Sequence, residues 1–273
     1  MRITSLMDNE CSIDGLLKQH GLSLYIETKG KKILFDTGAD AGFIHNAKAL
    51  NIDLSDVDMC VLSHGHYDHG GGLNAFFKIN EKSLAYMSAL ASNDHVALRA
   101  NGEYESIGIH ISRSYLDRLV FVDKQLKIDS FLIFSEVSGY FPLPTGNKSL
   151  FKEKGGAYVL DDFAHEQHLV VEEDGKYVLF AGCAHRGILN VLTYLKDKYG
   201  ILCDVVIGGF HLHNKTLNTF ENPVVLDTLA KELMNTKGKF YTCHCTGVPA
   251  YNYLKVIMKD QIDYLGTGET IEI

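Results

Sequence analysis

The stretch SHGHYDHGGG, which spans positions 63–72, places His64, His66, Asp68 and His69 within six positions. It directly follows the apolar run VDMCVLS, which predicts a buried strand. Imidazole and carboxylate groups are the ligands that zinc and similar divalent ions prefer. A polar loop would explain any one of these histidines, but it explains poorly four ligand-type residues at this spacing. The stretch therefore predicts a metal site at the end of a strand.

The spacing of the four side chains divides them between two ions. Asp68 and His69 are adjacent and diverge, so a single ion cannot easily take all four side chains. His64 and His66 can reach one ion while Asp68 and His69 reach a second. The glycines that follow allow the backbone to turn tightly beside the ions.

Upstream, the stretch ILFDTGAD at positions 33–40 is, on its own, typical of the catalytic strand of an aspartic protease. Such a protease needs two aspartates that share a proton. A second Asp-Thr-Gly or Asp-Ser-Gly is absent from the sequence, so the pair would have to form in a homodimer. We therefore interpret Asp36 as a carboxylate that accepts the free N–H of a ligating histidine. The alternative is a turn residue.

Two later motifs, GCAH and HCTG, place His185 and His244 directly after strand-like runs. Together with H-x-H-x-D-H and ILFDTG, they resemble the signature of the metallo-β-lactamase superfamily, in the same order. The resemblance implies an αββα sandwich, in which two mixed sheets are flanked by helices and loops at one sheet edge hold the metals. The ligands that it implies are His64, His66 and His185 for the first ion, and Asp68, His69 and His244 for the second.

The sequence departs from this family at the bridging aspartate that usually precedes the last histidine. The run CDVVIGGFHLH offers Asp204 and His211 instead. Asp204 begins the predicted strand, whereas the other ligands follow strand ends, so we favour His211 as a further ligand of the second ion. A histidine at the edge of the core is the alternative. With His211 in place, Asp68 would be the only anionic ligand of this set, which should favour anionic substrates or weaken the second ion.

Four segments, GLSLYIE, GCAH-x-GI-x-N, GGFHL and HCTG, resemble one branch of the superfamily in particular. That branch includes dihydropterin–ribofuranosylaminobenzene phosphate synthase. The resemblance implies an anionic, phosphorylated or otherwise charged, ring-bearing small-molecule substrate. It does not fix the reaction, because one fold hosts many functions.

These features predict a metal-dependent hydrolase or transferase. A hydroxide held between two divalent ions would attack an ester or phosphoester bond, and the metals would polarise the substrate oxygen. Asp68 could orient the hydroxide and pass a proton to the leaving group. Zinc suits these ligands best, while iron and manganese also fit. A catalytically silent binding or sensor protein of the same fold is the alternative. A di-iron oxygen-reactive relative fits less well, since it usually has Glu where His66 stands.

The remainder of the chain reads as one domain over residues 1–273, with a weakly patterned segment at about 88–163. We expect that segment to be an irregular insertion that forms the wall of the substrate pocket. His165, just beyond it, could reach a substrate phosphate. A solvent-facing turn is the alternative for His165 and for His168.

Composition excludes several classes of protein. The chain has 273 residues, of which 46% are hydrophobic and 22% charged, and a net charge of −8 without a basic run, which argues against nucleic acid as a partner. No apolar stretch reaches membrane-spanning length, so we expect no membrane association. The six cysteines form no C-x-x-C pair, which favours a reduced cytoplasm, and Cys243 and Cys245 are expected to be buried thiols. A homo-oligomer is compatible with the sequence.

Overall fold

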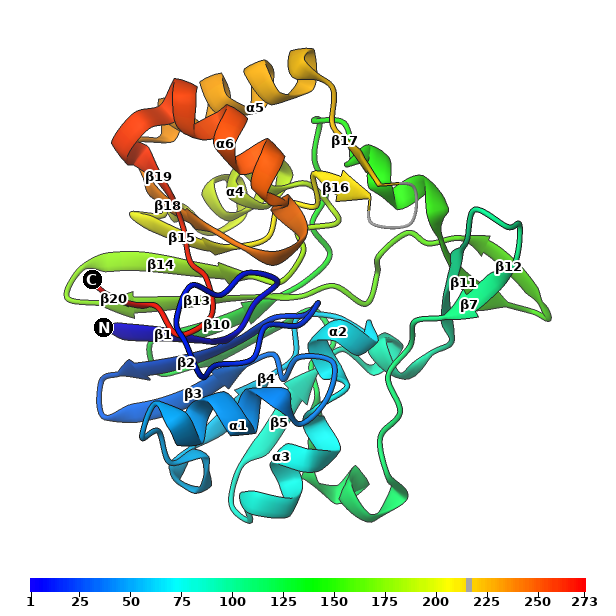
Figure 1. The fold of residues 1–273 in the computed structure, drawn as a ribbon, viewed down its shortest axis with the longest axis vertical. Coiled ribbons are helices and arrows are strands. Elements are labelled where there is room, and N and C mark those ends of the chain that lie inside the picture. The colour runs from blue at the N-terminus through cyan, green and yellow to red at the C-terminus, as the bar shows by residue number, and fades with distance from the viewer. Residues whose placement is uncertain (215–217) are drawn as a thin grey trace.

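The computed structural model describes residues 1–214 and 218–273, and it contains two seven-stranded sheets that pack face to face (Figure 1). The sheets lie between two layers of helices, which is the αββα sandwich that the sequence predicts. In spatial order, the first sheet contains β20 (Thr270–Glu272), β1 (Arg2–Met7), β2 (Ser23–Thr28), β3 (Lys31–Phe35), β4 (Met59–Val61), β5 (Leu84–Met87) and β8 (Leu119–Phe121). The second contains β19 (Ile262–Tyr264), β18 (Lys239–Thr242), β15 (Val205–Gly208), β14 (Lys176–Ala181), β13 (His168–Glu173), β10 (Phe131–Phe134) and β9 (Gln125–Ile128).

The sandwich is held together by strands that are apolar on both faces. In β3, Ile33 and Phe35 belong to the core between the two sheets, and the Phe35 ring centroid lies 5.9 Å from that of Phe180 on β14. Leu34, which points the other way, packs with Phe43 under the outer helices. A strand with a helix layer on one side and a second sheet on the other buries both faces. This explains why residues 33–35, ILF, are apolar without alternation.

Helices cover the outer face of each sheet (Figure 1). The α4 helix ends at Gly200, which adopts the left-handed conformation, and Asn222 caps α5 by accepting a hydrogen bond from the Val225 amide. The first sheet is covered by α1 (Gly42–Ala49) and α3 (Leu73–Ile79), with the short α2 (Tyr67–Gly70) beside them; the second is covered by α4 (Ile188–Tyr199), α5 (Pro223–Thr236) and α6 (Val248–Met258).

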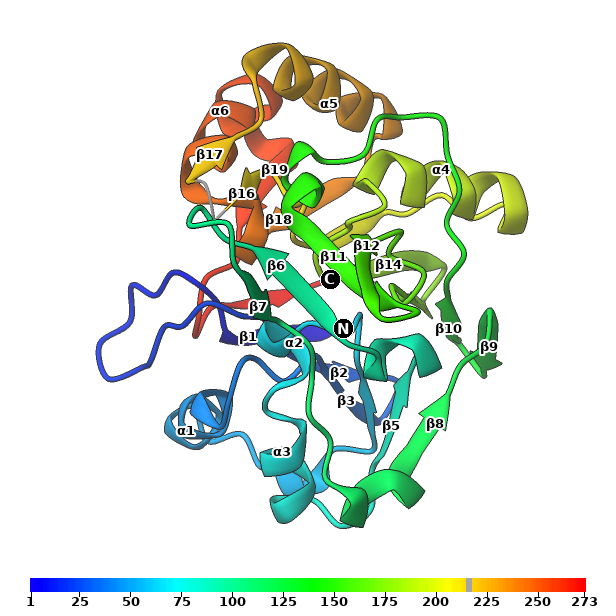
Figure 2. The same ribbon diagram turned by 90° about the vertical axis from the view of Figure 1, so that its right-hand side faces the viewer.

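The segment 88–163 is not a single irregular insertion, which corrects the expectation from the sequence. Its strands β8, β9 and β10 complete the two main sheets. Four others form a separate sheet in the order β12-β11-β6-β7, which stands beside the sandwich (Figure 2). These strands are short, and β7 and β12 are exposed along their whole length, so they lack the apolar alternation that marks a half-buried strand. Their bounds are β6 (His95–Leu98), β7 (Tyr104–Ser106), β11 (Leu150–Lys154) and β12 (Ala157–Leu160).

The remaining short elements are a two-stranded ribbon and several 3₁₀ helices. The ribbon pairs β16 (His213–Asn214) with β17 (Thr219–Phe220). The 3₁₀ helices are η1 (Leu54–Asp56), η2 (Ala89–Ser92), η3 (Arg113–Arg118), η4 (Thr145–Ser149), η5 (His244–Thr246) and η6 (Lys259–Gln261).

The direction of the central strands brings distant loops together. β3, β4 and β5 run parallel, and so do β14, β15 and β18. The carboxyl ends of parallel strands lie at one edge of a sheet, where ligand sites of such sheets are commonly found. The loops after β3, β4, β14, β15 and β18 therefore meet at one end of the sandwich.

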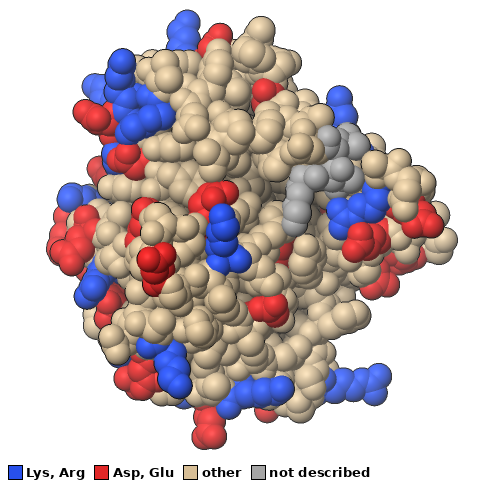
Figure 3. Space-filling model, viewed as in Figure 1, with Lys and Arg blue, Asp and Glu red and all other residues tan. Residues whose placement is uncertain are grey.

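The surface and the chain ends add two further observations. On the face shown in Figure 3, basic and acidic side chains of the described residues are interspersed. The two termini lie side by side, because β20 pairs with β1 and the Met1 amino group donates to the Ile273 carbonyl at 3.1 Å. Among the described residues, no helix is both long enough and apolar enough to cross a membrane.

Candidate metal centre

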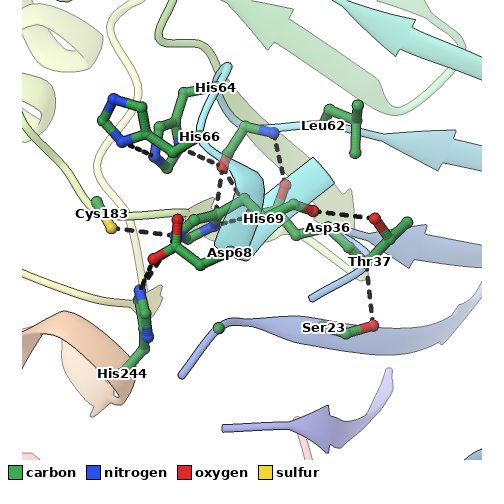
Figure 4. Close-up of polar contacts among 12 residues, drawn as sticks. Ser23, Asp36, Thr37, Leu62, His64, His66, Asp68, His69, Cys183 and His244 are labelled. Carbon is green, nitrogen blue, oxygen red and sulfur yellow. Dashed lines mark hydrogen bonds and ion pairs between the residues drawn. The ribbon is translucent and has the colours of Figure 1, made fainter. Parts of the chain in front are cut away.

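The H-x-H-x-D-H motif folds into a tight loop at the sheet edge (Figure 4). His64 follows β4, His66 precedes α2, and Asp68 and His69 lie on α2, all of them buried. Backbone from other loops packs directly against this segment. A side chain at Gly72 would place its Cβ 2.2 Å from the Thr37 carbonyl oxygen, so this position has room only for glycine.

The Asp36 carboxylate holds two of the motif histidines in place, His69 directly and His64 through Ser63. Its Oδ2 accepts from His69 Nδ1 at 2.6 Å and from Ser63 Oγ at 2.7 Å, and its Oδ1 accepts from the Ser63 amide at 2.7 Å. Since Ser63 Oγ donates its proton to Asp36, it must accept from His64 Nδ1, which lies 2.8 Å away. His64 and His69 thus turn Nδ1 toward the protein and Nε2 toward the opposite side. Asp36 lies where a carboxylate that holds a ligating histidine would lie.

His64, His66 and His185 form the first group of candidate ligands. His64 Nε2 lies 3.0 Å from His66 Nδ1, and the His185 ring centroid lies 5.0 Å from the centroids of both. His185 Nδ1 faces Asn147 Oδ1 at 3.0 Å, while its buried Nε2 has no hydrogen-bond partner within the described ranges. Burial, reinforced by neighbouring histidines, lowers the pKa of His64 and His185 well below the usual value. The rings are therefore neutral, which is the form that binds a metal.

Asp68, His69 and His244 form the second group. His244 Nε2 lies 3.2 Å from His69 Nε2 and 3.3 Å from Asp68 Oδ2. Although burial alone would raise the pKa of Asp68, the charge of His69 and a hydrogen bond from His20 hold it well below the usual range. Burial opposes a charge on His69, but Asp36 and Asp68 raise its pKa. A cation at His69 Nε2 would take the place of that proton.

The structure distinguishes between His211 and Asp204, the two candidates for the ligand that replaces the bridging aspartate of the family. His211 is buried beside His185, with ring centroids 4.2 Å apart, and neither of its ring nitrogens has a partner among residues 1–214 and 218–273. Asp204 lies at the start of β15 and accepts from the Tyr177 amide at 2.8 Å. Asp204 is thus at the opposite end of the sheet, and only His211 reaches the site.

Cys183 also lies at the centre of the site, which we had not expected from the sequence. Its Sγ lies 3.1 Å from His69 Nε2. Its sulfur also lies within 4.8 Å of candidate ligand atoms in three sets: His64 with His185, His69 with His244, and His211 with Cys245. The available signal was its position in GCAH, two residues before His185. Cys243 and Cys245 are buried, as expected.

His20 is a second residue at the site that sequence reasoning missed. Its Nε2 lies 3.1 Å from Asp68 Oδ2, and its ring centroid lies 4.8 Å from that of His244. It comes from the loop between β1 and β2, where no motif marks it.

His165 does not face the substrate cavity, contrary to the expectation from the sequence. It is buried, its Nδ1 accepts from the Gly65 amide at 2.9 Å, and its Nε2 lies 3.2 Å from Asp161 Oδ2. Because the Gly65 N–H can only donate, His165 must carry its proton on Nε2. It therefore supports the motif loop from behind. His168 is also buried, so the solvent-facing turn is wrong for both histidines.

Strained backbone marks the same region. Asp36, Ala184, His211 and His244 have φ angles of 60°, 49°, 51° and 45°. Non-glycine residues rarely adopt this left-handed conformation, and those that do cluster at functional sites. These four strained residues are candidate ligands or lie beside them.

A cavity of about 510 Å³ opens above the two groups. Asp68, His211 and His244 line its floor, while Arg99 and Glu105 from the four-stranded sheet line its wall. Arg99 Nε donates to Glu105 Oε2 at 2.5 Å. Cavities of this size are typical of small-molecule sites.

The donor set fits divalent metal ions, because buried imidazole nitrogens that have no partner within the described ranges lie in neighbouring groups with a carboxylate and a thiol. Together with the αββα fold, this defines a candidate metalloenzyme centre. The model of the metallo-β-lactamase superfamily matches residues 18–233, and the chain belongs to this superfamily.

Individual relatives cover nearly the whole chain. The protein is 29% identical to 7,8-dihydropterin-6-methyl-4-(β-D-ribofuranosyl)-aminobenzene-5′-phosphate synthase of Methanocaldococcus jannaschii, over 93% of this chain and 90% of that protein. It is 31% identical to an uncharacterised protein of the same organism, over 92% and 93%. The crystal structure of Tm1679, described as a metal-dependent hydrolase of the β-lactamase superfamily, superposes with a TM-score of 0.84, 28% identity and 100% and 99% coverage.

Proposed function

We propose that this protein is a metal-dependent hydrolase or transferase that acts on an anionic, phosphorylated and ring-bearing small molecule. The observation that carries the proposal is that candidate ligands gather around Cys183 at one cavity, which His66, Asp68, His211 and His244 line. His64, His66 and His185 would hold one divalent ion. Asp68, His69, His244 and His211 would hold the other, with Cys183 between the two groups. Zinc suits this mixture of imidazole, carboxylate and thiol.

Bound divalent ions would supply Lewis-acid chemistry, by activating water and polarising a substrate oxygen. The residues around them would position the substrate and move protons. Asp68 presents Oδ2 to His20 at 3.1 Å and to His244 at 3.3 Å, so a proton can pass between Asp68 and the cavity through His20. The Arg99 guanidinium, which is paired with Glu105, lies on the cavity wall, where it would face an anionic group of the substrate.

The relatives support the substrate class. The name of the synthase from Methanocaldococcus jannaschii describes a phosphorylated product that contains an aminobenzene ring. The Tm1679 structure is described as a metal-dependent hydrolase. A synthase and a hydrolase can share one centre if an activated oxygen or another nucleophile attacks the same type of bond. This is why the proposal includes both reaction types.

The first experiment measures metal content and activity in the same preparations. The wild type, His66→Ala, His211→Ala and the control His110→Ala, whose side chain is exposed, are purified without chelators. Elemental analysis is followed by assays with aryl phosphomonoesters, phosphodiesters and pyrophosphates. We expect nearly two ions per wild-type and control chain, less metal in the two site variants, and phosphoester turnover that depends on the metal. Full metal occupancy without turnover of any of these substrates would favour a binding or sensor protein.

A further inference from the structure

Two asparagines outside every motif hold two of the histidines that the second sheet contributes to the site, His185 and His244. Asn147, in η4, places Oδ1 3.0 Å from His185 Nδ1 and donates from Nδ2 to the His185 carbonyl oxygen at 2.8 Å. Asn9, just after β1, places Oδ1 2.9 Å from His244 Nδ1 and donates from Nδ2 to the His244 carbonyl oxygen at 3.1 Å. Each asparagine thus forms hydrogen bonds to both the ring and the backbone of a single histidine.

This two-point contact determines which ring nitrogen carries the proton. A backbone carbonyl can only accept, so the amide NH₂ of each asparagine must face it. The amide oxygen then faces the ring, and it too can only accept. Nδ1 of His185 and of His244 must therefore be the protonated nitrogen. At Asn9, the Gly21 amide donates to the same oxygen at 3.3 Å, which independently fixes the amide orientation.

The consequence is that Nε2 of both histidines carries a lone pair that points into the site. The buried Nε2 of His185 has no other partner in the part of the chain that the structure describes. His165 provides the contrast within the same region, since the Gly65 amide fixes its proton on Nε2.

We propose that Asn9 and Asn147 are positioning residues that set the Nδ1–H tautomer of His244 and His185 before any metal binds, one for each ion. This inference rests on the proposed metal-dependent function. It goes further in assigning to each asparagine control over a different ion. Partners of this kind fix the tautomer and ring orientation of metal-binding histidines, and their loss weakens metal affinity 10–100-fold, roughly.

The test compares Asn9→Leu and Asn147→Leu with two reference variants. Asn80→Leu is the control for the loss of a buried asparagine, because the Asn80 side chain is fully buried and bonds, among the described residues, only to backbone groups and the Arg118 guanidinium away from the site. Asn9→Asp retains an acceptor for the His244 ring and should restore the tautomer that Asn9→Leu loses. A merely structural role would not distinguish these two variants.

Two measurements are made on each protein. Long-range ¹H–¹⁵N correlation spectra of metal-free protein labelled with ¹⁵N-histidine report the tautomer of each ring. Competition with a chelator reports the affinity for each of the two zinc ions. We expect Asn9→Leu to change the His244 signals and to weaken one ion by about 10–100-fold, and Asn147→Leu to change the His185 signals and to weaken the other.

Three outcomes would overturn the inference. They are Nε2–H tautomers at these histidines in the wild type, losses no greater than in Asn80→Leu, and equal weakening of both ions by either variant. Failure of the proposed function looks different. Two bound ions without phosphoester turnover would refute the function and leave the asparagine assignment intact. A wild type that binds no metal would refute the function, and the tautomer spectra would still decide the assignment.

Discussion

Replacement of Asp36 by asparagine changes a single atom of the site and has a predictable cost. The carboxylate accepts three hydrogen bonds, two of them from Ser63 and one from His69. An amide has only one accepting oxygen, and its NH₂ group must then face a donor. If the oxygen stays on His69, the Ser63 amide loses its partner. If it turns to Ser63, His69 Nδ1 loses its acceptor and the ring is free to move its proton to Nε2.

The magnitude follows from these contacts. A hydrogen bond to a charged group contributes about 1.5–3 kcal/mol, and a buried donor left without a partner has a comparable cost. The neutral amide is easier to bury than the carboxylate, so the loss stays below the sum of three bonds. We expect Asp36→Asn to lower the free energy of unfolding by about 3 kcal/mol and to weaken the ion at His69 by about 10–100-fold.

The assay for Asp36→Asn combines urea unfolding of the metal-free protein with chelator competition for zinc. Asp204→Asn serves as the control, because the Asp204 carboxylate accepts a hydrogen bond from the Tyr177 amide at the opposite end of the sheet. The control should retain wild-type metal affinity. Our reasoning about Asp36 fails if Asp36→Asn matches the wild type in both measurements, or if Asp204→Asn weakens zinc to the same extent.

Three further changes test other parts of the structure. Cys183→Ser replaces a soft donor 3.1 Å from His69 with a hard one, so it should weaken zinc more than manganese; equal zinc binding by competition would remove the sulfur from the site. Burial lowers the pKa of His168 from 6.5 to about 3. As the pH falls below 6.5, His168 therefore takes up a proton in the unfolded chain but not in the folded one, and the wild type loses stability. When the pH is lowered from 6.5 to 4, the free energy of unfolding of His168→Leu, measured in urea, should fall by about 3 kcal/mol less than that of the wild type. Equal falls in the two proteins would contradict this. Gly72→Ala brings a Cβ to 2.2 Å from the Thr37 carbonyl and should lower both Tm and metal content, and an unchanged Tm would show that the loop can shift.

The sequence predicts those elements of the fold that have strong local signals. The run KKILF gives β3, and the glycine after α4 and the asparagine before α5 give the helix ends. The four-stranded sheet lacks such signals. All four residues of β12 are exposed, so no apolar alternation exists to be read. Its partner β11 also pairs with β6, more than fifty positions earlier, and no local pattern indicates that contact.

The candidate site divides in the same way. His64, His66, Asp68 and His69 come from one short motif, so their chemistry is visible in the sequence. His20 lies in no motif, and Cys183 lies in GCAH without being its expected ligand, so both are recognised by their distance from the others. His165 was misassigned because its segment, between two strands, resembles an exposed turn. In the fold, the segment is covered and His165 contacts the Gly65 amide, one hundred positions earlier.

The side chains that hydrogen-bond to the candidate ligand histidines come from different parts of the fold in the two sheets, and this affects how the site forms as the sheets pack together. The carboxylate beneath His64 and His69 belongs to the same sheet as these residues and to neighbouring loops. His244, by contrast, follows a strand of the second sheet, and its support comes from Asn9 on the first sheet, 235 positions away.

The half of the site on the first sheet can therefore form when that sheet forms. On the second sheet, His244 acquires its ring orientation only when the two sheets pack together. Metal binding to His244 then favours the packed sandwich over any state in which the sheets separate, because a ligand that binds only the folded form stabilises that form. Binding of the first ion depends in addition on the segment that connects the two halves of the chain, because His185 is held by Asn147 of η4 in that segment.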